Sequence, residues 1–486
     1  MSNETDDRAA ERSPLAISRR ACLAAAAGLA ASTATSGLAL AQSEPPAARP
    51  LRDRVLIRGG CVLTLDPALG DFERADVLIE GARIAAIQPN IEVAADGADV
   101  IDASGMIVMP GFVDTHRHMW QGALRNILPD GLLSDYGRDI TGAARAVFRP
   151  EDARIGDLVS ALGALNAGVT TILDWSHIGN SPAHTDAAIE GLREAGIRAV
   201  YAFGAGAAGA QNRYPDDIRR LRREHFASAD QLLTLALAAG ANPRDWALAR
   251  DVGAFISIHV VGGLGGITRD VMGADVTYIH CTNLPAETWR AIADTGGHVS
   301  IAGPIEMQMS HGVPPVQEAL DHGIRPSLSV DVETQQPSDM FSQMRAMFGL
   351  QRMLALERQR TGDRNAPELL SVRDVVEFAT LRGAIANGLQ VKTGSLAPGK
   401  EADVILLRAD TINVLPLNNA YGAVVLGMDT SNVDTVFVAG RARKRAGRLV
   451  DVDVERVRRQ AEQSRDYLLA QTGWPRTAFG GYLPGH

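Results

Sequence analysis

The pattern of hydrophobic and polar positions divides this chain into segments of two kinds. In the first kind, short aliphatic and β-branched runs are separated by glycines. Such runs cover residues 55–60, 77–81, 84–87, 402–407 and 433–440. Runs of this length, bounded by turn residues, predict β-hairpins. Because they lie toward both ends of the chain, we expect residues 51–108 and 391–452 to form the two parts of one composite β-sandwich.

Between these two parts, helix-like stretches alternate with β-type runs. Five times a helix-like stretch ends at a glycine and passes directly into a β-type run, at Gly168, Gly196, Gly253, Gly296 and Gly323. Glycine ends a helix at low cost because it adopts the left-handed conformation readily. Repeated helix–glycine–strand units predict a parallel sheet, so we expect a (β/α)8 barrel over residues 109–390. Residues 453–486 then form a C-terminal helix and tail.

The first fifty residues are typical of an export signal. Arg19-Arg20 precedes a run rich in Ala, Gly, Ser and Thr, which ends in Ala39-Leu40-Ala41, a small-x-small cleavage site. The arginine pair favours the twin-arginine route, and therefore a periplasmic location, although an Ala-rich tail with chance arginines is the alternative. We expect residues 1–41 to be removed and residues 42–50 to form a linker. The run is too weakly apolar to predict stable membrane insertion.

Composition and charge indicate which kind of molecule this protein binds. The chain has 486 residues, of which 46% are hydrophobic, so it can bury a large core. Its formal net charge of −9 argues against a nucleic-acid partner and favours a small-molecule substrate. Cys22 lies in the expected leader, which leaves Cys61 and Cys281 and predicts no disulfide framework. Whether the chain forms a homo-oligomer stays open.

Candidate metal ligands stand at the ends of four predicted strands. They are the pair His116 and His118, then His259, His280 and Asp331. Residues two apart in a strand point to the same side, and all strands of a parallel barrel end at the same rim. Each residue alone could be a hydrogen-bonded core group or a helix cap, but together they favour one divalent metal ion. Neutral imidazoles and a carboxylate suit zinc first, with iron as the alternative.

The motif Met109–His118 and the segment Gly399–Asp403 resemble the amidohydrolase superfamily. The similarity extends over nearly all of the mature chain, and it is greatest to the branch with cytosine deaminase, S-adenosylhomocysteine deaminase and triazine chlorohydrolases. The resemblance implies one metal held by His116, His118, His259 and Asp331.

The resemblance also implies that His280 contacts the attacking water or the substrate. In the mechanism that we expect, Asp331 accepts a proton from this water. No lysine ends the predicted fourth strand near residues 235–239, so a binuclear centre with a carbamylated lysine is not expected.

One position departs from the deaminases of this branch. They carry a glutamate three residues after the histidine of the fifth strand, as a proton shuttle, whereas this chain has Gly262 there. Substitute catalytic groups could be His177 or Glu306, and each could equally be a polar residue at the barrel rim. Candidate substrate contacts, each with a packing or solvent-facing alternative, are Trp120, Gln121, Arg125 and His311.

Three functions remain at this point. The first is hydrolysis of a C–N bond, of the deamination type, in a cyclic or heteroaromatic small molecule by a metal-activated water. The second is amide or C–Cl hydrolysis, which the missing glutamate favours because the leaving group needs no strong acid. The third is a periplasmic metal-binding or ligand-binding protein without turnover, against which the intact Asp331 argues.

Overall fold

The computed structural model describes residues 51–94, 97–211 and 213–478. The expected signal peptide (1–41) and linker (42–50) lie outside these residues, so export stays a prediction. Within the described part of the chain, no helix combines the length and the apolar character that crossing a membrane requires.

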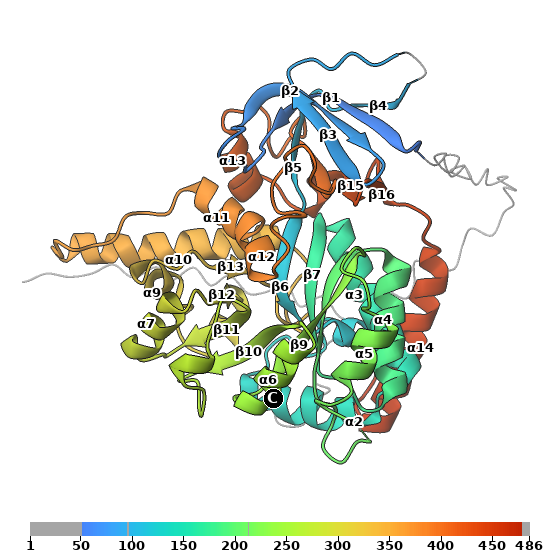
Figure 1. Ribbon diagram of the computed structural model, residues 1–486, viewed down its shortest axis with the longest axis vertical. Coiled ribbons are helices and arrows are strands. Elements are labelled where there is room, and N and C mark those ends of the chain that lie inside the picture. Colours follow the sequence, from blue (N-terminus) through green and yellow to red (C-terminus); the bar gives the residue numbers. More distant parts are fainter. Residues whose placement is uncertain (1–50, 95–96, 212, 479–486) are drawn as a thin grey trace, which may run out of the picture. The chain divides into compact units, whose positions relative to one another are not determined.

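Eight parallel strands, paired with one another in chain order, form the sheet that carries the site (Figure 1). The strands are β6 (Phe112–Arg117), β7 (Val169–Ser176), β8 (Arg198–Phe203), β9 (Leu233–Ala239), β10 (Phe255–Val261), β11 (Val276–Thr282), β12 (His298–Ile301) and β13 (Ser327–Leu328). A parallel bridge between Arg117 and Asp331 brings the last strand beside the first. The predicted (β/α)8 barrel is therefore confirmed, nearly closed at this junction.

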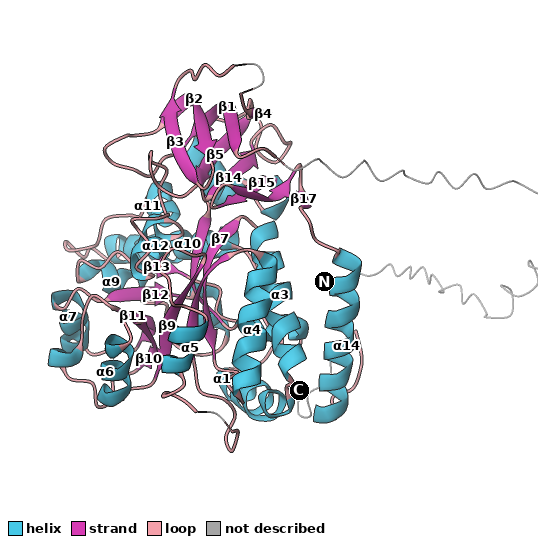
Figure 2. Cartoon of the chain, turned by 45° about the vertical axis from the view of Figure 1, so that its right-hand side comes forward, coloured by secondary structure: helices cyan, strands magenta, loops and turns pink. Residues whose placement is uncertain are grey.

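Helices follow the strands and surround the sheet (Figure 2). They include α3 (Pro150–Asn166), α4 (Pro182–Ala195), α5 (Ile218–Glu224), α6 (Pro243–Asp251), α7 (Ala286–Asp294), α9 (Val316–Asp321), α10 (Met340–Arg360), α11 (Val372–Phe378), α12 (Leu381–Ala386) and the C-terminal α14 (Val454–Thr472). The five predicted junction glycines each have φ between +65° and +85°. This conformation is strained for other residues, which explains why glycine stands at each junction.

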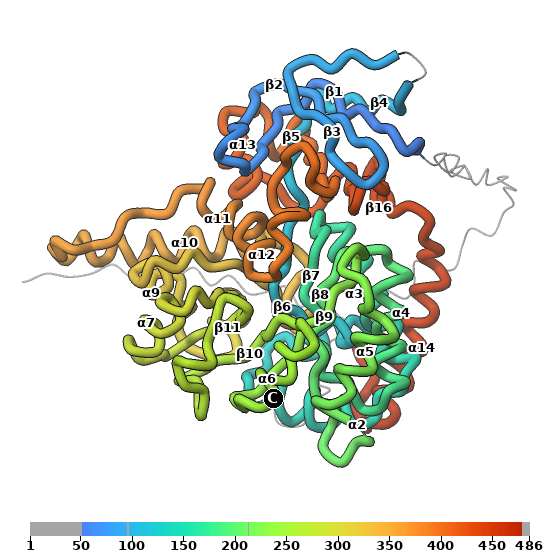
Figure 3. The backbone as a smooth tube through the Cα atoms, viewed as in Figure 1, coloured from blue at the N-terminus to red at the C-terminus, as the bar shows by residue number. Residues whose placement is uncertain are grey.

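A second, nine-stranded mixed sheet is built from both ends of the described chain (Figure 3). Its strands are β1 (Arg54–Val62), β2 (Phe72–Glu80), β3 (Arg83–Gln88), β4 (Asp99–Asp102), β5 (Met106–Pro110), β14 (Val404–Arg408), β15 (Val433–Val438), β16 (Arg441–Arg445) and β17 (Arg448–Leu449). The two ends join where β5 pairs antiparallel with β14. The predicted composite β-domain is therefore confirmed.

A buried ion pair ties the barrel to this sheet. Arg198 on β8 donates from Nε to Asp403 at 2.7 Å and from Nη2 to Glu401 at 2.6 Å. The side chains of Arg198 and Asp403 are almost fully buried. A planar guanidinium that meets two carboxylates is held in one orientation, so the pair fixes the relative position of β8 and the segment that precedes β14.

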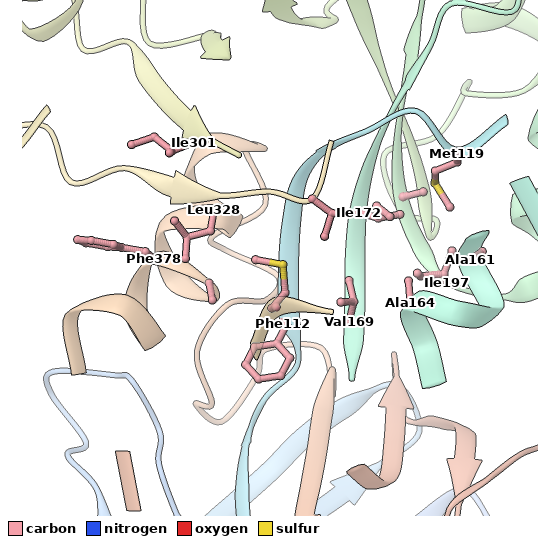
Figure 4. Close-up of a cluster of buried hydrophobic side chains, with 14 of the residues drawn as sticks. Phe112, Met119, Ala161, Ala164, Val169, Ile172, Ile197, Ile301, Leu328 and Phe378 are labelled. Atoms are coloured by element: carbon pink, nitrogen blue, oxygen red, sulfur yellow. The ribbon is translucent and has the colours of Figure 1, made fainter. Parts of the chain in front are cut away.

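Apolar side chains fill the space between the strands and the helices. Figure 4 shows Phe112, Val169 and Ile172 from the first two barrel strands close to Leu328 from the last. These side chains are fully buried. The packing holds the strand ends in fixed positions, which a site built from several strands requires.

Candidate active site

The histidine pair lies where β6 ends and a tight helical turn begins. His116 is in β6, and His118 immediately precedes the 3-10 helix η1 (Met119–Leu124). A side chain at Gly156 of α3 would lie 2.1 Å from the backbone oxygen of Trp120, so only glycine allows η1 to pack this closely on α3. The close contact holds the segment after His118 in place.

Imidazoles from three strands converge on one carboxylate. His116 Nε2 lies 2.9 Å from Asp331 Oδ1 and 3.1 Å from His259 Nε2. His118 Nε2 lies 3.4 Å from Asp331 Oδ1, and His280 Nε2 lies 3.9 Å from Asp331 Oδ2. All five predicted residues therefore come together at the carboxyl ends of the strands.

This donor set fits a divalent metal ion. One ligand atom from each of His116, His259, His280 and Asp331 lies within 4.8 Å of the other three. Burial, followed by the neighbouring histidines, lowers the pKa of His116 and His259 well below the usual value, so both are neutral. Neutral imidazole is the form that binds metal. The sequence predicted His118 rather than His280 in this set, and both remain candidates for the third imidazole ligand.

Backbone strain accompanies these residues. His280 and Asp331 have φ of +68° and +69°, in the left-handed region that side chains other than glycine, asparagine and aspartate seldom adopt. Asp331 is held there by two backbone hydrogen bonds: its N–H donates to the oxygen of His116, and its oxygen accepts from the N–H of His118. Strain of this kind is retained where the surroundings fix a side chain for function.

Glu306 forms a hydrogen bond with His280. It lies in the short helix α8 (Gly303–Gln308), and its Oε1 is 3.1 Å from His280 Nδ1 and accepts from the N–H of Ala302 at 2.8 Å. Burial would lower the pKa of His280, but the hydrogen bond to Glu306 and the charge of Asp331 raise it above its usual value. Burial also raises the pKa of Glu306, so the pair retains a proton between them.

His177 follows β7 and lies beside His118, with 4.1 Å between the ring centroids. The indole N–H of Trp120 donates to His177 Nδ1 at 3.2 Å, and the backbone oxygen of Trp175 is 3.3 Å from the same nitrogen. Because indole can only donate, Nδ1 accepts and the neutral ring carries its proton on Nε2. Burial, and then the charge of Arg145, lower the pKa of His177.

A cavity of about 350 Å³ opens over the cluster. Its lining consists of His118, Leu133, Tyr136, Thr141, Arg145, Trp175, His177, His259, Val261, His280, Met309, His311 and Asp331. Neither ring nitrogen of His311 has a partner among the described residues, and burial lowers its pKa to about 4. His177 and His311 are therefore placed where a substrate would bind.

The other three expected substrate contacts do not line this cavity. Trp120 is fully buried and packs its ring against Phe148. Gln121 is also buried, and its amide donates to the Tyr136 hydroxyl at 2.6 Å. Arg125 turns toward Glu333, which accepts from it at 2.8 Å. The reason is that η1 directs these side chains away from the cavity, and their contact with a substrate stays a prediction.

Sequence reasoning missed several residues of the lining, among them Trp175, Tyr136 and Arg145. Trp175 lies two positions before His177 in β7, so the alternation of the strand was an available signal. Tyr136 is the first residue of the π-helical segment η2 (Tyr136–Ala144) and Arg145 directly follows it, and no hydrophobic period predicts the wide turns of such a segment.

The position of the missing glutamate carries no acid. Gly262 lies just beyond β10 with φ +76°, and nothing lies within 4 Å of where its side chain would begin. The carboxylate that reaches the cluster besides Asp331 is Glu306, which comes from beyond β12.

Comparisons with known proteins agree with this site. A model of the Amidohydrolase family matches residues 107–443. A 5-methylthioadenosine/S-adenosylhomocysteine deaminase of Thermococcus kodakarensis is 27% identical over 417 residues, which are 80% of this chain and 93% of the relative. A 5'-deoxyadenosine deaminase of Methanosarcina mazei is 25% identical over 445 residues, which are 86% of this chain and 99% of the relative.

Solved structures share the fold. An adenosine deaminase from Xanthomonas campestris with bound zinc superposes with a TM-score of 0.70 at 20% identity, over 86% of this chain and 98% of the other. A variant of atrazine chlorohydrolase from Arthrobacter aurescens, complexed with zinc and atraton, gives 0.70 at 22% identity, over 85% and 100%. At these identities the likeness concerns the fold alone.

Proposed function

The chain belongs to the amidohydrolase family, and we propose that it removes an amino group from a nitrogen-containing aromatic ring and releases ammonia. It is a metal-dependent hydrolase that acts on C–N bonds of heteroaromatic small molecules. The observation that carries the proposal is the convergence of imidazoles on Asp331 at the base of a cavity large enough for a small ring. The deaminase names of the relatives support the choice of leaving group.

The metal of this family is a divalent ion, and we propose zinc, with iron as the alternative. His116, His259 and Asp331 would hold it, together with His118 or His280. When bound, the ion would lower the pKa of a water molecule and polarise the substrate.

The side chains around this position would move the protons. Asp331 would accept the proton that the attacking water loses, because its carboxylate lies at the centre of the cluster. His280, supported by Glu306, would stabilise negative charge on the ring. His177, a neutral ring whose Nε2 carries its hydrogen, would hydrogen-bond to the substrate, and the proton that Asp331 accepts from the water would pass to the departing amine. Trp175 and Met309 would exclude water from the face of the ring.

Gly262 provides no acidic side chain where the deaminases of this branch carry a glutamate. This favours one alternative, hydrolysis of an amide or a C–Cl bond. Chloride leaves as a stable anion and needs no proton, so its release would not require the acid that this position lacks. A ring that carries chloride instead of an amino group would occupy the same cavity.

A product assay with the full-length, zinc-loaded protein tests the proposed function. We expect ammonium from at least one amino-substituted pyrimidine, purine or triazine, and a rate that falls at least about 100-fold on chelation and returns with zinc, because the metal supplies the nucleophile. Chloride or carboxylate release without ammonium would overturn deamination in favour of the alternative. No product at all at full zinc occupancy would favour a binding protein.

Export is a separate proposal, supported by the arginine pair and the small-residue cleavage site at the N-terminus. Cell fractionation of a bacterium that expresses the full chain tests it. We expect the unchanged chain in the periplasm and the variant with Arg19→Lys and Arg20→Lys in the cytoplasm, since the route recognises the arginine pair. Equal periplasmic amounts of both chains would contradict the twin-arginine route.

A further inference from the structure

Arg145 is the one lysine or arginine among the described residues that line the active-site cavity. It stands at the start of α2 (Arg145–Val147), directly after η2. We propose that its guanidinium binds a negatively charged oxygen of the substrate, so that the natural substrate is an anionic heteroaromatic compound such as a ring carboxylate. The inference rests on the proposed function only in taking this cavity as the substrate site.

The Arg145 guanidinium has no carboxylate partner among the described residues. Its Nε is buried and makes no hydrogen bond, and no carboxylate of the described residues lies within 4 Å of it to form a salt bridge. Its one side-chain hydrogen bond to a described residue, from Nη1 to the backbone oxygen of His177, is long at 3.5 Å. A buried donor without an acceptor costs free energy, so a ligand that supplies the acceptor gains by removing that cost.

Neighbouring residues on the same segment show the contrast. Arg138 and Arg149, which precede and follow Arg145, each form short hydrogen bonds to an aspartate. Both of these arginines are outside the cavity lining. The segment therefore pairs its outward arginines within the protein and leaves the inward one, Arg145, with its charge directed to the cavity.

A second donor lies close to Arg145. The Tyr136 hydroxyl accepts from Gln121, which leaves its own proton free to donate toward the cavity. The proximity of the two groups is reflected in the pKa of Tyr136, which burial raises strongly and the charge of Arg145 opposes. A guanidinium and a hydroxyl together suit a carboxylate, because charged hydrogen bonds are shorter and stronger than neutral ones.

Asp331, the carboxylate that lines the cavity, does not neutralise Arg145. The Asp331 carboxylate is engaged by His116 at 2.9 Å and by His118 at 3.4 Å. Among the described residues, the rest of the wall offers no further carboxylate, and it includes the apolar side chains of Leu133, Val261 and Met309. A substrate anion is therefore the charge that would neutralise Arg145.

Equilibrium binding of two isosteric probes tests this inference. Pyridine-3-carboxylate and pyridine-3-carboxamide have the same shape and differ in charge, and neither carries an amino group on the ring. By calorimetry on the zinc-loaded protein, we expect the carboxylate to bind at least about 10-fold more tightly, as hydrogen bonds to charged groups allow. Arg145→Ala and Arg145→Gln should reduce this preference to less than about 2-fold.

Arg138→Ala is the matched control, since it removes an arginine from the same segment outside the cavity and should keep the preference. Metal content is measured in each variant, because a carboxylate could bind the ion itself. A preference that survives in both Arg145 variants, or that the unchanged protein lacks, overturns the inference. Because the probes carry no amino group on the ring and are compared by binding, loss of the preference is distinguishable from a failure to release ammonium from an amino-substituted ring, which would count against the proposed function alone.

If the proposed function holds, the dependence of the carboxylate preference on Arg145 should also appear in steady-state kinetics. For 4-aminopyrimidine-5-carboxylate, we expect Arg145→Ala to raise KM at least about 10-fold with a smaller change in kcat, and for the 5-carboxamide to leave KM within about 2-fold. An equal rise in KM for both compounds would show that the variant disturbs the cavity as a whole, and it would overturn the role of charge recognition.

Discussion

Asp331→Asn is expected to lower kcat for ammonium release by about 10³-fold or more while the chain stays folded. General-base catalysis alone contributes about 10²- to 10⁴-fold, and asparagine cannot take the proton of the attacking water. The fold should tolerate the change, because asparagine also adopts the left-handed conformation that φ of +69° demands. The two backbone hydrogen bonds that hold the residue do not involve its side chain.

Loss of the metal must be separated from loss of the base. Zinc per chain is therefore measured by elemental analysis, and activity is measured at an excess of zinc that restores full occupancy. Asp410→Asn is the control, since Asp410 is an exposed carboxylate paired with Arg408. If Asp331→Asn retained more than about a tenth of the activity at full zinc occupancy, Asp331 would not be the base.

The fold could be predicted because glycine marks each junction of the barrel. Gly168, Gly196 and Gly253 end helices with a conformation that few other residues adopt, so their positions carry information that does not depend on distant contacts. The β-type runs near both ends of the chain likewise predicted one sheet formed by the two ends. The pairing of β5 with β14 could not be predicted from local pattern, because it joins residues about 300 positions apart.

The metal cluster could be predicted for a similar reason. Strand ends of a parallel barrel meet at one rim, so His116, His259 and Asp331 had to come together once the strands were recognised. The choice between His118 and His280 could not be made in this way. It depends on side-chain orientation within a few ångströms, and two imidazoles at the ends of different strands, β6 and β11, satisfy the same pattern.

The lining of the cavity was the least predictable part. Trp120 and Trp175 both lie beside strand ends that carry histidines, yet only Trp175 lines the cavity. The difference arises because a 3-10 helix follows β6 and turns Trp120 into the core. Arg145 was missed because its segment forms a π-helix, and loop conformation of this kind follows tertiary contacts rather than a period in the sequence.

Glu306→Gln is expected to lower kcat by about 10²-fold with little change in KM. Glutamine can still accept a hydrogen bond from His280 Nδ1 and from Ala302, so the shape of the site is kept. It no longer offers the negative charge that stabilises a positively charged imidazole. A carboxylate behind a histidine both orients the ring and strengthens its action on the other nitrogen, and the loss should therefore affect the chemical step rather than binding.

Three readouts make this second result decisive. The thermal midpoint of Glu306→Gln should stay close to that of the unchanged protein, and zinc per chain should not fall, because the buried volume and the acceptor are retained. Glu318→Gln, at an exposed position of α9, serves as the matched control and should leave kcat unchanged. Should Glu306→Gln turn over at the normal rate while Glu306→Ala loses stability, Glu306 would be a packing residue. Glu306 supplies charge to the reaction through His280 only if kcat falls while stability and metal content hold.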